Sequence, residues 1–139
     1  MDKKLSEKLV VEAFEGEGLK RVVESGDWFV GIKNYKTAND AQLFTFMEKH
    51  FLTDEVFVLL SGGCVLLIDV SADDSCSDIR LCPMETGKVY CVTKGVWHNT
   101  IVTKDVKMIL VENRNTSGDN SEMFNLPEDQ LIALRKKLA

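Results

Sequence analysis

Hydrophobic and polar residues alternate in a series of short segments along most of the chain. These segments lie at residues 19–24, 27–35, 41–50, 53–60, 64–70, 79–84, 89–93, 97–103 and 106–112. Polar or glycine-containing turns separate them, and Ser61-Gly62-Gly63 is typical of a tight hairpin. Many short strands at regular intervals predict an all-β sandwich or barrel rather than alternating strands and helices.

Helical spacing of apolar residues occurs only near the two ends. Residues 3–14 predict a short amphipathic helix that lies against the barrel or a partner subunit. A second helix is predicted at about 126–138, with Asn125 as its cap and three leucines as its apolar stripe. The polar stretch from Asn113 to Glu122 predicts a loop. We therefore expect a single domain over residues 1–139, with a β core at about 19–113.

Size and charge exclude several classes of protein. The chain has 139 residues and a net charge of -5, which argues against nucleic-acid binding because that requires a basic face. No apolar stretch approaches the length of a membrane span, and the N-terminus does not resemble a signal peptide. These features predict a cytoplasmic protein that binds neither nucleic acid nor membrane.

The four cysteines include no Cys-x-x-Cys pair, which excludes the usual zinc or redox spacing. In a reducing compartment they are expected to be free thiols. Cys64 and Cys91 lie in apolar strand-like segments and are predicted to be core residues. Cys76, in the polar loop at 71–78, is predicted to be the exposed thiol.

The chemistry is concentrated around the only two histidines, His50 and His98. Glu48 and His50 are two apart on one predicted strand and therefore share a face. Glu55 opens the next apolar segment, and His98 follows a Lys-Gly turn. If these strands are neighbours in a closed sheet, the four side chains can converge, and two imidazoles with two carboxylates suit a divalent metal.

The spacing of these residues resembles the two motifs of the cupin family. His50, Glu55 and Gly62 match the second His, the Glu and the closing Gly of the first motif. Gly87, Gly95 and His98 match the second motif. The chain departs from the family pattern at four other positions, which are Gln42 for Gly, Glu48 for His, Thr93 for Pro and Val102 for Asn. The resemblance covers residues 42–113 and implies a double-stranded β-helix, the cupin jelly-roll barrel, and a homodimer.

The role of Glu48 stays open at this point. As a fourth ligand with His50, Glu55 and His98, it would neutralise a dication. If it turns away, the other three form the two-His-one-carboxylate set of non-haem iron enzymes, and Glu48 could act as a general base. A third possibility is a site without metal, in which Glu48 accepts a hydrogen bond from His50.

Three functions follow from these alternatives. The first is a cupin-fold protein that holds Fe, Mn, Zn or Ni and acts on a polar small molecule, with isomerisation and dioxygenation both open. The second is a binding or sensor protein that uses the same pocket without catalysis or a functional metal. The third is a structural protein with a residual site. A fold by itself does not decide between them.

Overall fold

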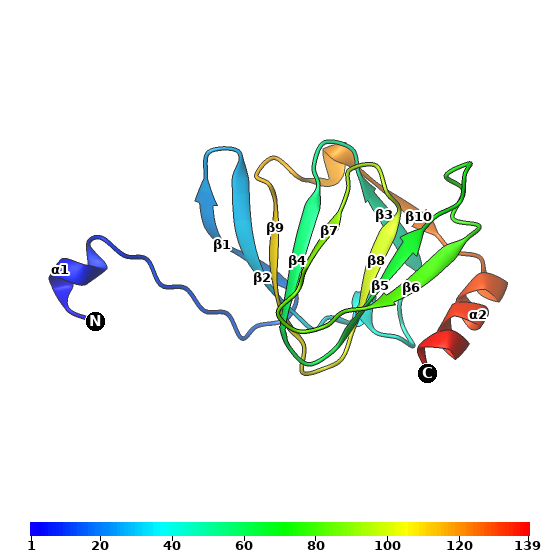
Figure 1. Cartoon of the computed structure of the whole chain (residues 1–139), viewed down its shortest axis with the longest axis horizontal. Coiled ribbons are helices and arrows are strands. Elements are labelled where there is room, and N and C mark those ends of the chain that lie inside the picture. The colour runs from blue at the N-terminus through cyan, green and yellow to red at the C-terminus, as the bar shows by residue number, and fades with distance from the viewer.

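A computed structural model describes residues 1–139 and shows two five-stranded antiparallel sheets facing each other (Figure 1). The first sheet has the order β1 (Leu19–Ser25), β2 (Trp28–Asn34), β9 (Lys107–Asn113), β4 (Glu55–Ser61) and β7 (Val89–Val92). The second has the order β10 (Ser121–Asn125), β3 (Phe46–His50), β8 (His98–Val102), β5 (Cys64–Asp69) and β6 (Ile79–Pro83). Each alternating segment in the sequence contains one strand, which confirms the all-β prediction.

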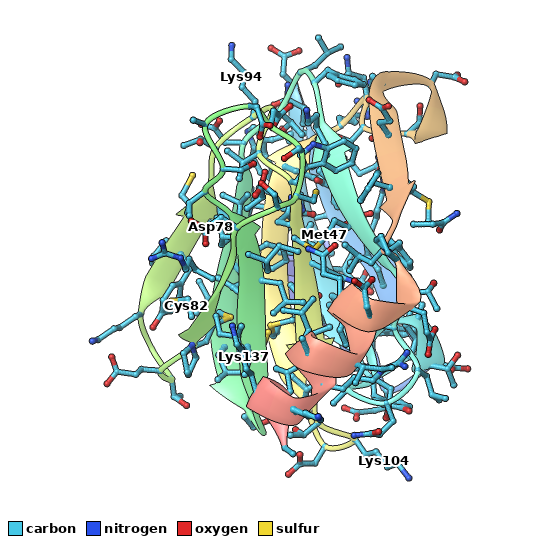
Figure 2. The ribbon with its side chains drawn as sticks, turned by 90° about the vertical axis from the view of Figure 1, so that its right-hand side faces the viewer. Met47, Asp78, Cys82, Lys94, Lys104 and Lys137 are labelled. Atoms are coloured by element: carbon cyan, nitrogen blue, oxygen red, sulfur yellow. The ribbon has the colours of Figure 1, made fainter.

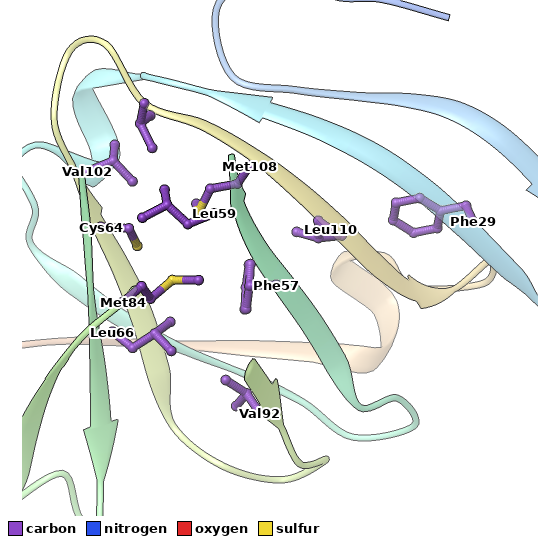
Figure 3. Packing of buried hydrophobic residues seen from close by; sticks show 11 residues of the cluster. Phe29, Phe57, Leu59, Cys64, Leu66, Met84, Val92, Val102, Met108 and Leu110 are labelled. Atoms are coloured by element: carbon purple, nitrogen blue, oxygen red, sulfur yellow. The ribbon is translucent and has the colours of Figure 1, made fainter. Parts of the chain in front are cut away.

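The space between the sheets is filled by apolar side chains that alternate along the strands (Figure 3). Phe29, Phe57, Met108 and Leu110 are almost completely buried there. Residues two apart on a strand share a face, so the inward face of β9 continues from Met108 and Leu110 to Glu112. The inward face of β9 therefore passes from apolar side chains to a buried carboxyl group near the end of the strand.

A second core lies on the outer face of the second sheet, beneath helix α2 (Glu128–Leu138). Figure 2 shows this helix in front of the strands, with Met47 beside it. Leu131 and Leu134 of the helix belong to one buried cluster with Met47, Leu67 and Ile101. The predicted C-terminal helix is therefore present, and it covers the outer face of one sheet only.

The two ends of the chain differ from the prediction in detail. Helix α1 covers only Lys3–Ser6, and residues 9–14 are not helical. The apolar stripe of such a short helix needs a surface to pack on, and α1 stands away from the barrel (Figure 1). Asn125 ends strand β10 and does not cap α2, which has Pro127 at its N-cap position. Two short 3-10 helices, η1 (Thr37–Asn39) and η2 (Gly118–Asn120), complete the elements.

Two of the three cysteine predictions are wrong. Cys64 is buried as expected, but Cys91 is exposed because it points away from the interior, between the inward Tyr90 and Val92 of β7. Cys76 is buried because the polar loop folds back and places it in the cluster under α2. All four cysteines are free. None of the helices has both the length and the apolar character needed to cross a bilayer.

Candidate functional site

The four predicted site residues come together at one end of the space between the sheets. Glu48 and His50 lie on β3, while Glu55 and His98 are the first residues of β4 and β8. Glu48 pairs directly with His98 across β3 and β8. Both sheets therefore contribute, with Glu55 from the first and the other three from the second.

Their possible ligand atoms all lie within 4.8 Å of one another. The ring centroids of His50 and His98 are 5.3 Å apart. Oε1 of Glu55 lies 2.8 Å from Nε2 of His98 and 3.7 Å from Nε2 of His50. His98 is 43 to 50 positions from the other three residues in sequence, yet all four form one compact group, as the motif spacing indicated.

Loops hold the strand ends in these positions. The Gly95 amide donates to the His50 carbonyl at 2.8 Å, so the turn before His98 is bonded to the end of β3. The Lys94 amide donates to Oδ1 of Asp54, just before Glu55. Gly95 has a φ of +79°, a conformation that glycine adopts without strain. The backbone conformation therefore explains why glycine occupies this motif position.

His98 is held at both ring nitrogens. Nδ1 lies 2.9 Å from the Val96 carbonyl oxygen, and Nε2 lies 2.8 Å from Oε1 of Glu55. Both oxygens only accept, so both contacts are hydrogen bonds when the ring carries two protons. Burial alone would lower the pKa of His98, but the Glu55 carboxylate outweighs it and raises that pKa. Burial likewise opposes ionisation of Glu55, yet hydrogen bonding to the histidines lowers its pKa.

His50 has one partnered and one unpartnered nitrogen. Nδ1 is 2.7 Å from Oγ of Ser121 on β10, which orients the ring. Nε2 is buried and has no hydrogen-bond partner. Its nearest carboxylates, on Glu48, Glu55 and Glu112, are 3.7 to 3.9 Å away, too far for a hydrogen bond. Ser121 falls in the predicted loop, so the sequence analysis missed this contact.

Glu112 is a fifth member of the group that sequence reasoning also missed. Its side chain is buried at the inner end of β9, and Oε2 has no hydrogen-bond partner. Burial, together with the nearby charge of Glu55, raises the pKa of Glu112 to about 8. Its position two residues beyond Leu110 on an inward face was the available signal.

Glu48 is the most accessible of the acids, with 32% of its side chain exposed. Oε1 lies 3.8 Å from Nε2 of both His50 and His98. Two of the three alternatives for Glu48 are therefore not seen. Its side chain does not turn away from the group, and at 3.8 Å it does not accept a hydrogen bond from His50. Glu48 and His50 line a cavity of about 410 Å³ whose wall includes Ser117 and Ser121. This cavity gives a small molecule a route to the group.

A buried cation lies in the interior below these acids. Lys33 on β2 donates to Oγ1 of Thr100 at 2.8 Å, and Thr100 is two residues along β8 from His98. Burial lowers the pKa of Lys33, while the charges of Glu55 and Glu48 oppose that effect. Lys33 is thus a partial counter-charge to the acidic group.

The residues fit a divalent metal ion on two grounds. Imidazole nitrogens and carboxylate oxygens are suitable donors for Fe, Mn, Zn or Ni. His50 Nε2 and Glu112 Oε2 are buried without partners, which costs about 1–3 kcal/mol for each such group. The two unpartnered atoms lie 3.9 Å apart, and His50 is one of the four clustered residues. The cluster could therefore hold a metal ion.

Comparison with known sequences finds no matching family model and no matching curated protein. Solved structures do match. A cupin-2 domain protein from Shewanella frigidimarina has a TM-score of 0.54 at 18% identity, covering 73% of this chain and 85% of that chain. A Bacillus halodurans protein has a TM-score of 0.57 at 13% identity, over 73% of each chain. Pac13 from Streptomyces, described as a unique nucleoside dehydratase, has a TM-score of 0.55 at 10% identity, over 86% and 88%.

Identities this low bear on the fold and not on the reaction. The two facing antiparallel sheets agree with the match to a cupin-2 domain structure. The chain is therefore a small protein with the cupin fold, a double-stranded β-helix.

Proposed function

We propose that the protein binds a divalent metal ion through His50, His98, Glu55 and Glu48 and acts on a polar small molecule. The observation that carries this proposal is the convergence of four ligand atoms within 4.8 Å of one another. The buried and unpartnered Nε2 of His50 supports it, because that atom already points at the three carboxylates. The cavity beside Glu48 and His50 supplies the route for the substrate.

The bound ion would act as a Lewis acid and a template for the substrate. The surrounding residues supply orientation and proton transfer. The Val96 carbonyl and Ser121 hydroxyl fix the two imidazole rings through their Nδ1 atoms, as second contacts of ligating histidines commonly do. Glu112 has a pKa raised to about 8, so its carboxyl group holds a proton near neutral pH. If Glu48 is not a ligand, its accessible carboxylate can serve as the general base.

The proposal also concerns the class of reaction. Isomerisation and dioxygenation are both compatible with the donor set. The description of Pac13 as a nucleoside dehydratase adds dehydration, which needs a base and an acid on either side of one substrate. Glu48 and the protonated Glu112 are suitable groups for that pair.

Metal content tests the proposal directly. The protein is purified without added metal, exchanged against Mn(II), Fe(II), Zn(II) and Ni(II) in turn, and analysed by elemental mass spectrometry. We expect about one ion per chain in the wild type and at least a tenfold loss of affinity in His98→Gln. The matched control is Glu122→Gln on the exposed strand β10, which lies outside the cluster. Wild-type protein that binds none of these ions would contradict the proposal.

One observation favours a second function, in which the site binds a ligand without metal. Glu55 and His98 already form a buried pair at 2.8 Å, and this pair satisfies both groups without a cation. A thermal-shift screen of protein treated with a chelator separates the two functions. Stabilisation by small metabolites but by none of the four metals would favour the metal-free site.

A further inference from the structure

A second cavity lies on the far side of the His and Glu group from the cavity beside Glu48 and His50. In the second sheet, β8 with His98 separates β10 and β3 from β5 and β6, and in the first sheet β4 with Glu55 lies next to β7. The second cavity lies between β6 and β7, which are the last strands of their sheets and do not pair with each other. We call it the edge cavity.

The edge cavity has a volume of about 260 Å³, and seven of its eight lining residues are hydrophobic. The lining includes Leu66 and Ile68 of β5, Cys82 of β6, Tyr90 and Val92 of β7, and Val96. Leu66 and Val92 lie at the same end of the core in Figure 3, and Cys82 lies on the left-hand side of the molecule in Figure 2. Core residues therefore form the floor of the cavity, and the exposed Cys82 marks its opening.

The lining of the edge cavity disfavours a charged ligand. None of the eight residues is charged, and only Tyr90 and Thr93 carry a side-chain oxygen. The Tyr90 hydroxyl accepts a hydrogen bond from the Glu85 amide at 2.9 Å, which holds it to the backbone. A charge bound here would lose its water without gaining a partner. An uncharged apolar ligand avoids that cost and gains free energy from the apolar surface that it removes from water.

The volume of the edge cavity sets the size of its ligand. A cavity of about 150 Å³ lined by aliphatic and aromatic side chains holds benzene. The edge cavity is larger than this, so it admits a single ring or a short alkyl chain. It is smaller than the range of about 300–1,000 Å³ that is typical for drug-sized ligands. The volume therefore favours a small molecule over a large cofactor.

Three lining residues connect the edge cavity to the candidate metal site. Val92 is the cross-strand partner of Glu55, and Ile68 is the cross-strand partner of His98. The Cβ atoms of directly opposite residues on one face of a sheet are about 4.5–5.5 Å apart. The Val96 carbonyl oxygen lies 2.9 Å from Nδ1 of His98. Glu55 and His98 do not themselves line the cavity, so one layer of side chains separates its contents from the group.

We propose that the edge cavity binds a small uncharged apolar molecule, a single ring or a short alkyl chain, and that its occupancy affects the Glu55–His98 pair. This ligand is separate from the small molecule bound at the group, because the edge cavity shares no lining residue with the group or with the cavity beside it. Val92, Ile68 and Val96 carry the effect, since each contacts the ligand on one side and adjoins the pair on the other. The site therefore does not require a bound metal ion.

Methyl NMR of the full chain in the presence of a chelator tests the proposal, with normal alcohols from ethanol to octanol as probes and glycerol as the polar control. We expect saturable shifts of the Ile68 and Val92 methyl signals, with affinity rising about fourfold for each added CH₂ until the chain fills the cavity. The imidazole signals of His98 should shift with the same dissociation constant, and glycerol should move neither. Methyl signals that do not shift at any chain length would overturn the binding site, and methyl shifts without a response of His98 would overturn the coupling.

A variant that fills the edge cavity gives a second measurement. Cys82 faces inward, because its cross-strand partner Leu66 is a core residue. Cys82→Phe should weaken the binding of hexanol at least tenfold, since the added ring occupies the cavity. Val89→Phe is the matched control and should bind hexanol as the wild type does, because Val89 is 70% exposed on β7 and does not line the cavity. An unchanged hexanol affinity in Cys82→Phe would place the alcohol elsewhere and overturn the proposal.

Discussion

At the scale of single residues, the sequence predicted only part of the group of His and Glu side chains between the sheets. The alternation of β3 and the two turns placed Glu48, His50, Glu55 and His98 correctly, because the period of a strand fixes which side chains share a face. Glu112 was missed although it follows Met108 and Leu110 on one inward face. Spacing within a motif identifies residues of that motif, and Glu112 lies outside both cupin motifs.

Replacement of Glu112 by Gln should stabilise the protein at neutral pH. The pKa of Glu112 is raised from 4.5 to about 8, so the unfolded state releases this proton more readily. The contribution of Glu112 to the free energy of unfolding is therefore fully present below pH 4.5 and is lost as the pH rises toward 8. Gln keeps the shape without the titration. Urea denaturation in the presence of a chelator should show Glu112→Gln about 1–3 kcal/mol more stable at pH 7. Near pH 4.5 the two proteins should be equal, and a gain that is independent of pH would contradict this cause.

Lys33→Met should also be stabilising. Burial lowers the pKa of Lys33, so the folded state disfavours the protonated amine relative to the unfolded state. The contribution of Lys33 to the free energy of unfolding therefore rises with pH toward 10.5. Met fills similar space without the charge. Urea denaturation at pH 7 should show a gain of about 1 kcal/mol, which shrinks as the pH approaches 10. Lys104→Met is the control, because Lys104 is exposed and lies at the lower end of the molecule in Figure 2. A loss of stability in Lys33→Met would show that its charge is needed to balance Glu48 and Glu55.

At the scale of elements, strands were predicted correctly where an alternating apolar pattern was bounded by turn residues. Nine strands were found because apolar residues recur every second position between turns. Strand β10 was missed because its residues are mostly polar and exposed, and its backbone pairing with β3 leaves no hydrophobic pattern. The helix predicted at 3–14 fails for the opposite reason. Its apolar spacing is real, but no surface of the same barrel receives it.

Gly62 shows how one turn residue fixes the β4–β5 hairpin. Its φ is +71°, and a Cβ there would lie 2.7 Å from backbone atoms of Val106. Gly62→Ala should therefore lose more than about 3 kcal/mol of unfolding free energy, since left-handed backbone alone costs about 1–2 kcal/mol. Gly87 is the matched control, with a φ of +83° and open space around it. Gly87→Ala should lose only the backbone part. Equal losses in the two variants would show that the close approach to Val106 relaxes freely.

At the scale of the whole molecule, the candidate ligands join the two sheets. Glu55 belongs to the first sheet, and Glu48, His50 and His98 belong to the second. The sequence could predict this arrangement because the cupin resemblance supplied the topology, which local patterns do not contain. The covering of one outer face by α2 and the bare state of the other could not be predicted, because they depend on where segments distant in sequence pack.

A metal ion held across both sheets should stabilise the entire fold and not just the loops near it. Binding to the folded state alone adds about 2.7 kcal/mol when free metal is a hundredfold above its dissociation constant. For a chain of this length, that corresponds to a rise in Tm of roughly 10 °C. Differential scanning calorimetry with increasing Mn(II) or Zn(II) measures it. Glu55→Gln removes the ligand from the first sheet, so it should abolish most of the rise, while Glu122→Gln on the exposed strand β10 should not. Metal uptake without any change in Tm would mean that the ion binds outside the group that bridges the sheets.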